Sequence, residues 1–129
     1  IKPYFLSKNT ESFIEGNLSK DDAIMVQPGY GTPLLYQTNR RMVGLSSRPD
    51  DLLFLIEYYN ISYVLFGRFY SWDKYYYSVD SVEYIMNNQD KFEYITTIQE
   101  DYSNLPFITR DPKRKTDDIY IYKVKEGVV

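Results

Sequence analysis

The sequence predicts an α/β fold, a Rossmann-like three-layer sandwich with a mainly parallel central sheet and an antiparallel C-terminal strand pair. Two observations predict it. Short apolar runs alternate along the chain with segments of helical periodicity, an order typical of parallel sheets with helical crossovers. The last two strand-like segments instead alternate apolar and polar residues, which favours antiparallel neighbours with one face in water. Because the 129 residues contain no repeat or linker, we expect one soluble domain over residues 1–129.

Five segments have the composition of strands. The first three are nearly uninterrupted apolar runs, as expected for strands that are buried on both faces of a sheet. The other two have the period of two that marks a strand with one buried face. The predicted strands are residues 23–26, 42–45, 62–67, 92–98 and 118–124.

Four segments carry apolar residues at helical spacing. The strongest pattern covers residues 50–59, where we expect Asp50 or Asp51 to be the N-cap. In the first helix the expected cap is Asn9 or Thr10. The predicted helices are residues 9–18, 32–38, 50–59 and 79–89.

The composition excludes several classes of function. The chain has no Cys and no His, so thiolate nucleophiles, imidazole bases and the usual zinc ligands are missing. The net charge is −3, and the one dense basic run, residues 113–115, lies beside acidic residues, which argues against nucleic acid as a partner. No segment has the roughly 18 to 20 apolar residues of a transmembrane helix. We expect no catalytic residue, metal or cofactor in this chain.

The loops after the first and third predicted strands meet where open α/β sheets usually bind ligands. They are rich in aromatic and charged residues, which stack on sugar rings and bond sugar hydroxyls. The same residues also suit a packing loop, or a surface that rests on a membrane or a partner domain. The candidate residues for contact with a sugar or acceptor are Tyr30, Arg68, Tyr70, Trp72 and Asp73.

Other short motifs have structural explanations. Gly29-Tyr30-Gly31 stands where a phosphate-binding loop would be, but the third glycine of that fingerprint is absent and Pro33 removes an amide, so a tight turn is favoured. Three acidic pairs each precede a strand or helix, where turn and capping roles explain them. These pairs are Asp21-Asp22, Asp50-Asp51 and Asp117-Asp118.

Two Asn-x-Ser sequons follow predicted helices in turns that could carry a glycan. They begin at Asn17 and Asn60, which are the candidate N-glycosylation sites. Such tripeptides also arise by chance in a chain rich in asparagine. The sequons permit glycosylation without requiring it.

Several phrases of the sequence form a wider pattern between Glu11 and Val124. A helix ending in Glu-Gly-Asn-Leu-Ser-Lys-Asp-Asp leads into the strand Ala-Ile-Met-Val, a Tyr-x-Thr-x-Arg stretch ends at Arg40, and Ile-Tyr-Ile-Tyr-Lys-Val closes the chain. This succession resembles the soluble domain after the last transmembrane helix of many archaeal and bacterial multi-pass glycosyltransferases. Those enzymes are similar to dolichyl-phosphate-mannose protein mannosyltransferases.

The resemblance implies a non-catalytic role for this chain. Enzymes of that family take their sugar from lipid-phosphate-linked donors, and their catalytic acids lie between early transmembrane helices, outside this sequence. The domain would lie on the extracytoplasmic face of the cell membrane, anchored through a missing N-terminal part. Its expected partners are the transmembrane part of the same chain and a glycan or lipid-linked sugar, with no nucleic acid. It would assist in binding the acceptor or glycan.

Two alternatives remain. An archaeal oligosaccharyltransferase has the hallmark Trp-Trp-Asp-Tyr-Gly, whereas here only Trp72-Asp73 is present, between Ser71 and Lys74, so the sequence speaks against that identification. The other alternative is a free-standing or singly anchored module that binds a ligand or protein and has no enzymatic activity.

Overall fold

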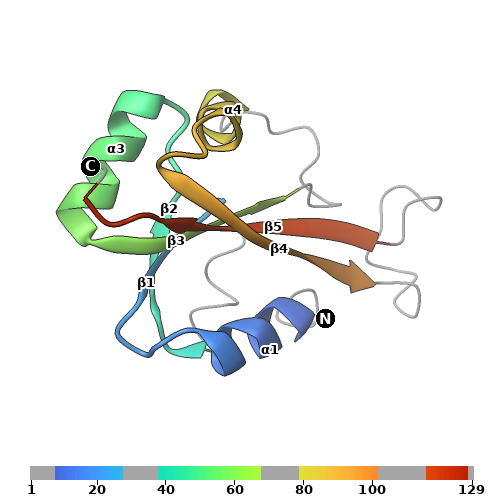
Figure 1. Ribbon diagram of the computed structural model, residues 1–129. Helices are drawn as coiled ribbons and strands as arrows, with labels where there is room; N and C mark the ends of the chain where they lie inside the picture. The colour runs from blue at the N-terminus through green and yellow to red at the C-terminus, as the bar shows by residue number, and fades with distance from the viewer. Residues whose placement is uncertain (1–7, 28–37, 68–78, 102–115, 128–129) are drawn as a thin grey trace.

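The computed structural model describes residues 8–27, 38–67, 79–101 and 116–127. Within these ranges β1 and β2 follow one another, helices and strands then alternate, and the last two elements are strands (Figure 1). No helix in the described ranges is long and apolar enough to cross a membrane. In chain order the elements are α1 (Lys8–Asn17), β1 (Ala23–Val26), β2 (Arg41–Gly44), α3 (Pro49–Tyr59), β3 (Ile61–Gly67), α4 (Val79–Asn87), β4 (Phe92–Asp101) and β5 (Thr116–Val124).

The strands form one five-stranded mixed sheet in the order β2-β1-β3-β5-β4. The first three are parallel, since β1 pairs in the same direction with β2 and with β3. The C-terminal strands are antiparallel, β5 to β3 and β4 to β5. The antiparallel C-terminal pair is therefore confirmed. The sheet as a whole is mixed, with as many antiparallel as parallel pairings among the described strands.

Helices cover both faces of this sheet. Figure 1 shows α1 on one side, and α3 and α4 on the other. Each side has its own apolar cluster. Ile14 of α1 packs with alternate residues of β1 and β5, whereas Leu52 of α3 and Ile85 of α4 pack with the residues between them. The α/β class is confirmed, and the narrower Rossmann-like assignment stays a prediction.

Helix α3 begins one residue before the predicted start. Pro49 occupies the first turn, where its missing N–H has no helical partner to lose, and Arg48 is the extended N-cap. Asp50 and Asp51 were predicted caps, but no side chain caps this helix. Both lie inside its first turn, where a negative charge favours the positive end of the helix dipole. The helix ends at Tyr59, and its C-cap is Asn60, a residue type that tolerates the left-handed backbone found there (φ 54°) better than most.

Strand β4 contains an irregularity that changes which face its side chains point to. Its pairing with β5 shifts between Tyr94 and Thr96, so Ile95 is an extra residue in the edge strand. Before the shift, Phe92 belongs to the cluster under α3 and α4. After it, Ile98 packs against the cluster under α1. The predicted simple alternation with one wet face is therefore wrong, since β4 contributes to both clusters.

The last two strands are longer than predicted. Strand β4 runs to Asp101, beyond the predicted 98, and β5 starts at Thr116, before the predicted 118, because the two strands stay paired over this extension. The predicted helix 32–38 lies outside the described residues except at Thr38.

Candidate functional site

The crevice predicted at the carboxyl ends of β1 and β3 is described only up to the strand ends. The two strands are parallel neighbours, and the Gln27 side chain accepts a hydrogen bond of 3.0 Å from the Gly67 amide. A Cβ at Gly67 would overlap the Asp118 carbonyl oxygen of β5, so glycine is required there. The candidate contact residues Tyr30, Arg68, Tyr70, Trp72 and Asp73 lie outside the described residues, and their role stays a prediction.

A groove of about 560 Å³ opens at the opposite edge of the sheet. It lies where β1 and β3 begin and β5 ends, beside the last turn of α3. Its volume is in the range of small-molecule sites. Its lining combines carboxylates, ammonium groups, an amide and hydroxyls over an apolar base of Ile56, Ile61 and Val124. The polar residues are Asp22, Glu57, Asn60, Ser62, Tyr63, Lys123, Lys125 and Glu126.

The mixed charges of the groove decide what it can bind. Within the described ranges its lining holds two lysines and three carboxylates, so no single sign of charge dominates and a strongly anionic ligand is not favoured. The donors and acceptors suit a neutral, hydroxyl-rich molecule. Among the described residues no group of three or more acidic side chains is placed to hold a metal ion. The groove is therefore a polar surface of mixed charge.

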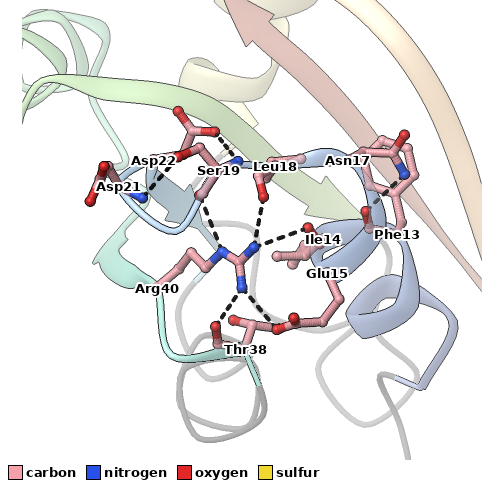
Figure 2. Close-up of polar contacts among 10 residues, drawn as sticks. All are labelled: Phe13, Ile14, Glu15, Asn17, Leu18, Ser19, Asp21, Asp22, Thr38 and Arg40. Carbon is pink, nitrogen blue, oxygen red and sulfur yellow. Dashed lines mark hydrogen bonds and ion pairs between the residues drawn. The ribbon is translucent and has the colours of Figure 1, made fainter.

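Arg40 is the most heavily bonded side chain near this end of the molecule (Figure 2). It is 2% exposed and lies at the C-terminal end of α1. Its guanidinium donates to the carbonyl oxygens of Leu18 and Thr38, both at 2.7 Å, and to that of Ser19 at 3.2 Å. It also pairs with the half-exposed Glu15 carboxylate at 2.8 Å. A fixed cation thereby satisfies the carbonyls that a helix end leaves unpaired.

Glu100 has the complementary role at the other end of α1. Its buried carboxylate accepts the backbone N–H groups of Asn9 and Thr10, at 3.1 and 2.7 Å, and the Thr10 hydroxyl at 2.6 Å. Asn9 and Thr10 were predicted to cap α1 themselves, but the helix begins at Lys8 and a residue about 90 positions away supplies the acceptor. The pKa of Glu11, in the first turn of α1, is raised mainly by partial burial and secondly by the negative charge of Glu100.

Of the acidic pairs, Asp22 has the turn role that was predicted. Its carboxylate accepts the Ser19 amide at 2.8 Å in the turn between α1 and β1. The Asp118 carboxylate accepts a long hydrogen bond of 3.5 Å from the Gln99 side-chain amide across the β4–β5 ladder. Both contacts are structural, and neither brings two carboxylates together.

The two sequon asparagines are both exposed and lie at helix ends, as predicted. Asn17 is the last residue of α1, and its side-chain amide donates to the Phe13 carbonyl at 2.9 Å. Asn60 follows α3 and lines the groove. Whether either carries a glycan stays a prediction.

Arg40 and Glu100 were not among the predicted site residues. For Arg40 a weak signal existed, since it ends the Tyr-x-Thr-x-Arg stretch. Glu100 had none, because an acidic residue near a strand end resembles any solvated position. Their partners lie 21 to 26 and 90 to 91 residues away in the sequence, respectively, apart from the local Arg40–Thr38 bond.

The described residues form a mixed α/β fold with a polar groove. No protein-family model and no curated protein sequence matches the chain. Among solved structures, it is similar to the C-terminal globular domain of an oligosaccharyltransferase, AfAglB-S2, from Archaeoglobus fulgidus. The TM-score is 0.55 at 14% identity, over 92% of this chain and 96% of that one. At this identity the likeness shows the fold alone.

The match bears on the resemblance drawn from the sequence. That structure belongs to a glycosyltransferase-associated globular domain, in keeping with the general kind of protein expected. It comes from an oligosaccharyltransferase, which the sequence had disfavoured, and gives no support to the mannosyltransferase-like family in particular. The segment that departs from the oligosaccharyltransferase hallmark, around Trp72-Asp73, lies outside the described residues.

Proposed function

We propose that this chain is a non-catalytic, extracytoplasmic domain of a membrane glycosyltransferase, and that it helps to hold the acceptor or glycan. The observation that carries the proposal is the fold it shares, over nearly its whole length, with the C-terminal domain of an oligosaccharyltransferase. A lipid-phosphate-linked sugar is the proposed donor, and the transmembrane part of a longer chain is the proposed partner. The catalytic groups lie in that part.

The composition and the groove support a binding role over a catalytic one. No residue of the chain is a Cys or a His, and the groove offers hydrogen-bonding groups of both kinds. Neutral sugars are recognised by many such bonds rather than by one strong charge. The Tyr30 and Trp72 crevice is proposed as a second surface for the same purpose.

The test is to find the native chain and the side of the membrane on which it lies. Antibodies against the 129 residues should detect a membrane-bound protein much larger than 15.4 kDa. Protease added to intact cells should remove the epitope while a cytoplasmic marker survives. A free protein of 15.4 kDa in the cytoplasm would contradict the proposal.

The alternative function, a ligand- or protein-binding module without any enzyme, is favoured by one feature of α3. Phe54 and Tyr58 are 63% and 69% exposed, and their rings stack with centroids 5.7 Å apart. Exposed stacked aromatic rings are typical of contact surfaces. A singly anchored native protein that loses its partner when both rings are replaced by Ser would favour this alternative.

A further inference from the structure

We infer that Asn60, and not Asn17, is the acceptor of an N-linked glycan in the folded chain. The inference rests on the proposed function, which places the chain on the extracytoplasmic side of the membrane. N-linked glycans are added on that side. Both residues begin an Asn-x-Ser sequon and both are exposed, so sequence and exposure alone do not separate them. The surroundings of the two tripeptides do.

The reaction needs the whole tripeptide. The Asn side-chain nitrogen Nδ2 bonds to C1 of the first sugar of a lipid-pyrophosphate-linked oligosaccharide. The bond from C1 to the phosphate oxygen breaks, the lipid pyrophosphate leaves with that electron pair, and the amide gives one proton to a base of the transferase. Since the transferase must reach both Asn and Ser, the backbone between them has to leave the protein surface. The middle residues Leu18 and Ile61 are 6% and 4% exposed, so each site reacts through local opening.

Opening is opposed at Asn17 by the Arg40 contacts (Figure 2). The buried guanidinium donates to the carbonyls of Leu18 and Ser19, two of the three residues of this sequon. The Ser19 amide is also bonded to the Asp22 carboxylate at 2.8 Å. To lift residues 17–19 out of the surface, these bonds must break and a buried charge must lose its partners. Removing the partner of a buried charge is among the more expensive local changes in a protein.

The Asn60 sequon is held by no side-chain hydrogen bond among the described residues, although Ile61 pairs with Ala23 at the start of β3. The Asn60 backbone N–H donates to the Glu57 carbonyl at 3.3 Å and also to the Ile56 carbonyl, and within the described part of the chain its side-chain amide makes no hydrogen bond. Ser62 has no register partner on either side, because the pairing of β1 with β3 skips it and the pairing of β3 with β5 begins at Tyr63. Ile61 anchors the tripeptide through its buried side chain and its pairing with Ala23. The left-handed backbone explains why Asn suits position 60, but it places no demand on the hydroxyl at Ser62.

The structure also leaves room for the product. Asn60 is exposed and lines the groove of about 560 Å³, so a sugar attached there meets open, polar space. The groove's hydroxyls and charged groups can bond the hydroxyls of the first sugars. A glycan at this position is therefore compatible with the closed fold.

The test is in vitro glycosylation of the folded 129-residue chain. A purified oligosaccharyltransferase and its lipid-pyrophosphate-linked oligosaccharide are supplied, and each site is followed by glycopeptide mass spectrometry. Peptides covering residues 14–22 and 57–65 give the intrinsic rate of each sequon. After this correction we expect Asn60 to react about tenfold faster than Asn17 or more, since reaction follows the open population. Equal rates, a faster Asn17, or no product at Asn60 would overturn the inference.

Arg40→Met tests the cause of the preference. Without the guanidinium, the corrected rate at Asn17 should rise severalfold toward that at Asn60, whereas Arg41→Met, at an exposed neighbour, should change neither rate. Where Arg40→Met does not fold, hydrogen exchange of the wild-type chain replaces it. Amides 18–19 should then exchange more slowly than those of 60–62, and the reverse order overturns the inference.

Analysis of protein isolated from its native cells can distinguish failure of this inference from failure of the proposed function. A chain recovered from the outer face of the membrane with Asn60 unmodified contradicts the inference alone. A chain recovered on the cytoplasmic side contradicts the proposed function, whereas the site preference measured in vitro is unaffected by location.

Discussion

Replacing Arg40 with Met should cost the chain a large part of its stability. The two shortest bonds of the guanidinium, to the carbonyls of Leu18 and Thr38, are both 2.7 Å long and buried. A hydrogen bond with one charged partner contributes about 1.5 to 3 kcal/mol, and two of them give roughly 3 to 6 kcal/mol. Because Met fills much of the vacated volume, we expect a loss near the lower end, about 3 to 4 kcal/mol. Domains of this size are stable by only about 5 to 15 kcal/mol, so the loss is easily measured.

Urea unfolding of matched variants is the assay. Arg41→Met, on the exposed neighbour, should change the free energy of unfolding by less than about 0.5 kcal/mol. Glu15→Gln should cost at most about 1 kcal/mol, because that carboxylate is half exposed and water replaces the ion pair. Arg40→Lys keeps the charge but loses the planar fork, so it should fall between wild type and Met. If Arg40→Met unfolds within about 1 kcal/mol of wild type, the carbonyls do not depend on the guanidinium and the reasoning is wrong.

Three further outcomes are expected. Glu100→Gln should lower the free energy of unfolding by about 1 to 3 kcal/mol, because its NH₂ replaces one carboxylate oxygen and at least one backbone N–H of α1 loses its acceptor; an unchanged thermal midpoint would exclude capping by this residue. Glu11→Gln should stabilise the chain at pH 7 and lose that advantage near pH 3 in urea titrations. Burial and Glu100 raise the pKa of Glu11, so the folded state prefers its neutral form, and wild type gains stability as the pH falls from neutral towards the ordinary value of 4.5. An advantage that grows on acidification would reverse this sign. Gly67→Ala should destabilise the sheet, because its methyl group overlaps the backbone of Asp118; wild-type stability of this variant would show that the two strands lie further apart.

Local pattern was enough to predict most of the described elements. Residues 23–26 are an apolar run that occurs as β1 with the predicted limits, and residues 50–59 carry a helical spacing that occurs as α3. The antiparallel pairing of the last strands followed from their alternation. These features depend on neighbours in the sequence, which a single sequence displays.

What could not be predicted depends on distant partners. Glu100 reads as a solvated acidic residue until the fold brings α1 above the end of β4. Arg40 reads as a surface cation, yet it is buried because helix-end carbonyls and Glu15 surround it. The groove lies at the amino ends of the parallel strands, whereas the general rule directed the prediction to the opposite edge. The site prediction at that opposite edge stays open, because its residues lie outside the described ranges.

Because Ile95 is an extra residue in β4, the number of residues in this strand decides which face of the sheet its later side chains point to. A strand turns its side chains over at every step, so one insertion between Phe92 and Ile98 decides which helix layer everything beyond it meets. Deleting Ile95 would turn Glu100 away from α1 and expose that helix end. Substitutions at Ile95 should therefore be tolerated far better than its loss, and related chains should vary in sequence here while keeping the same residue count.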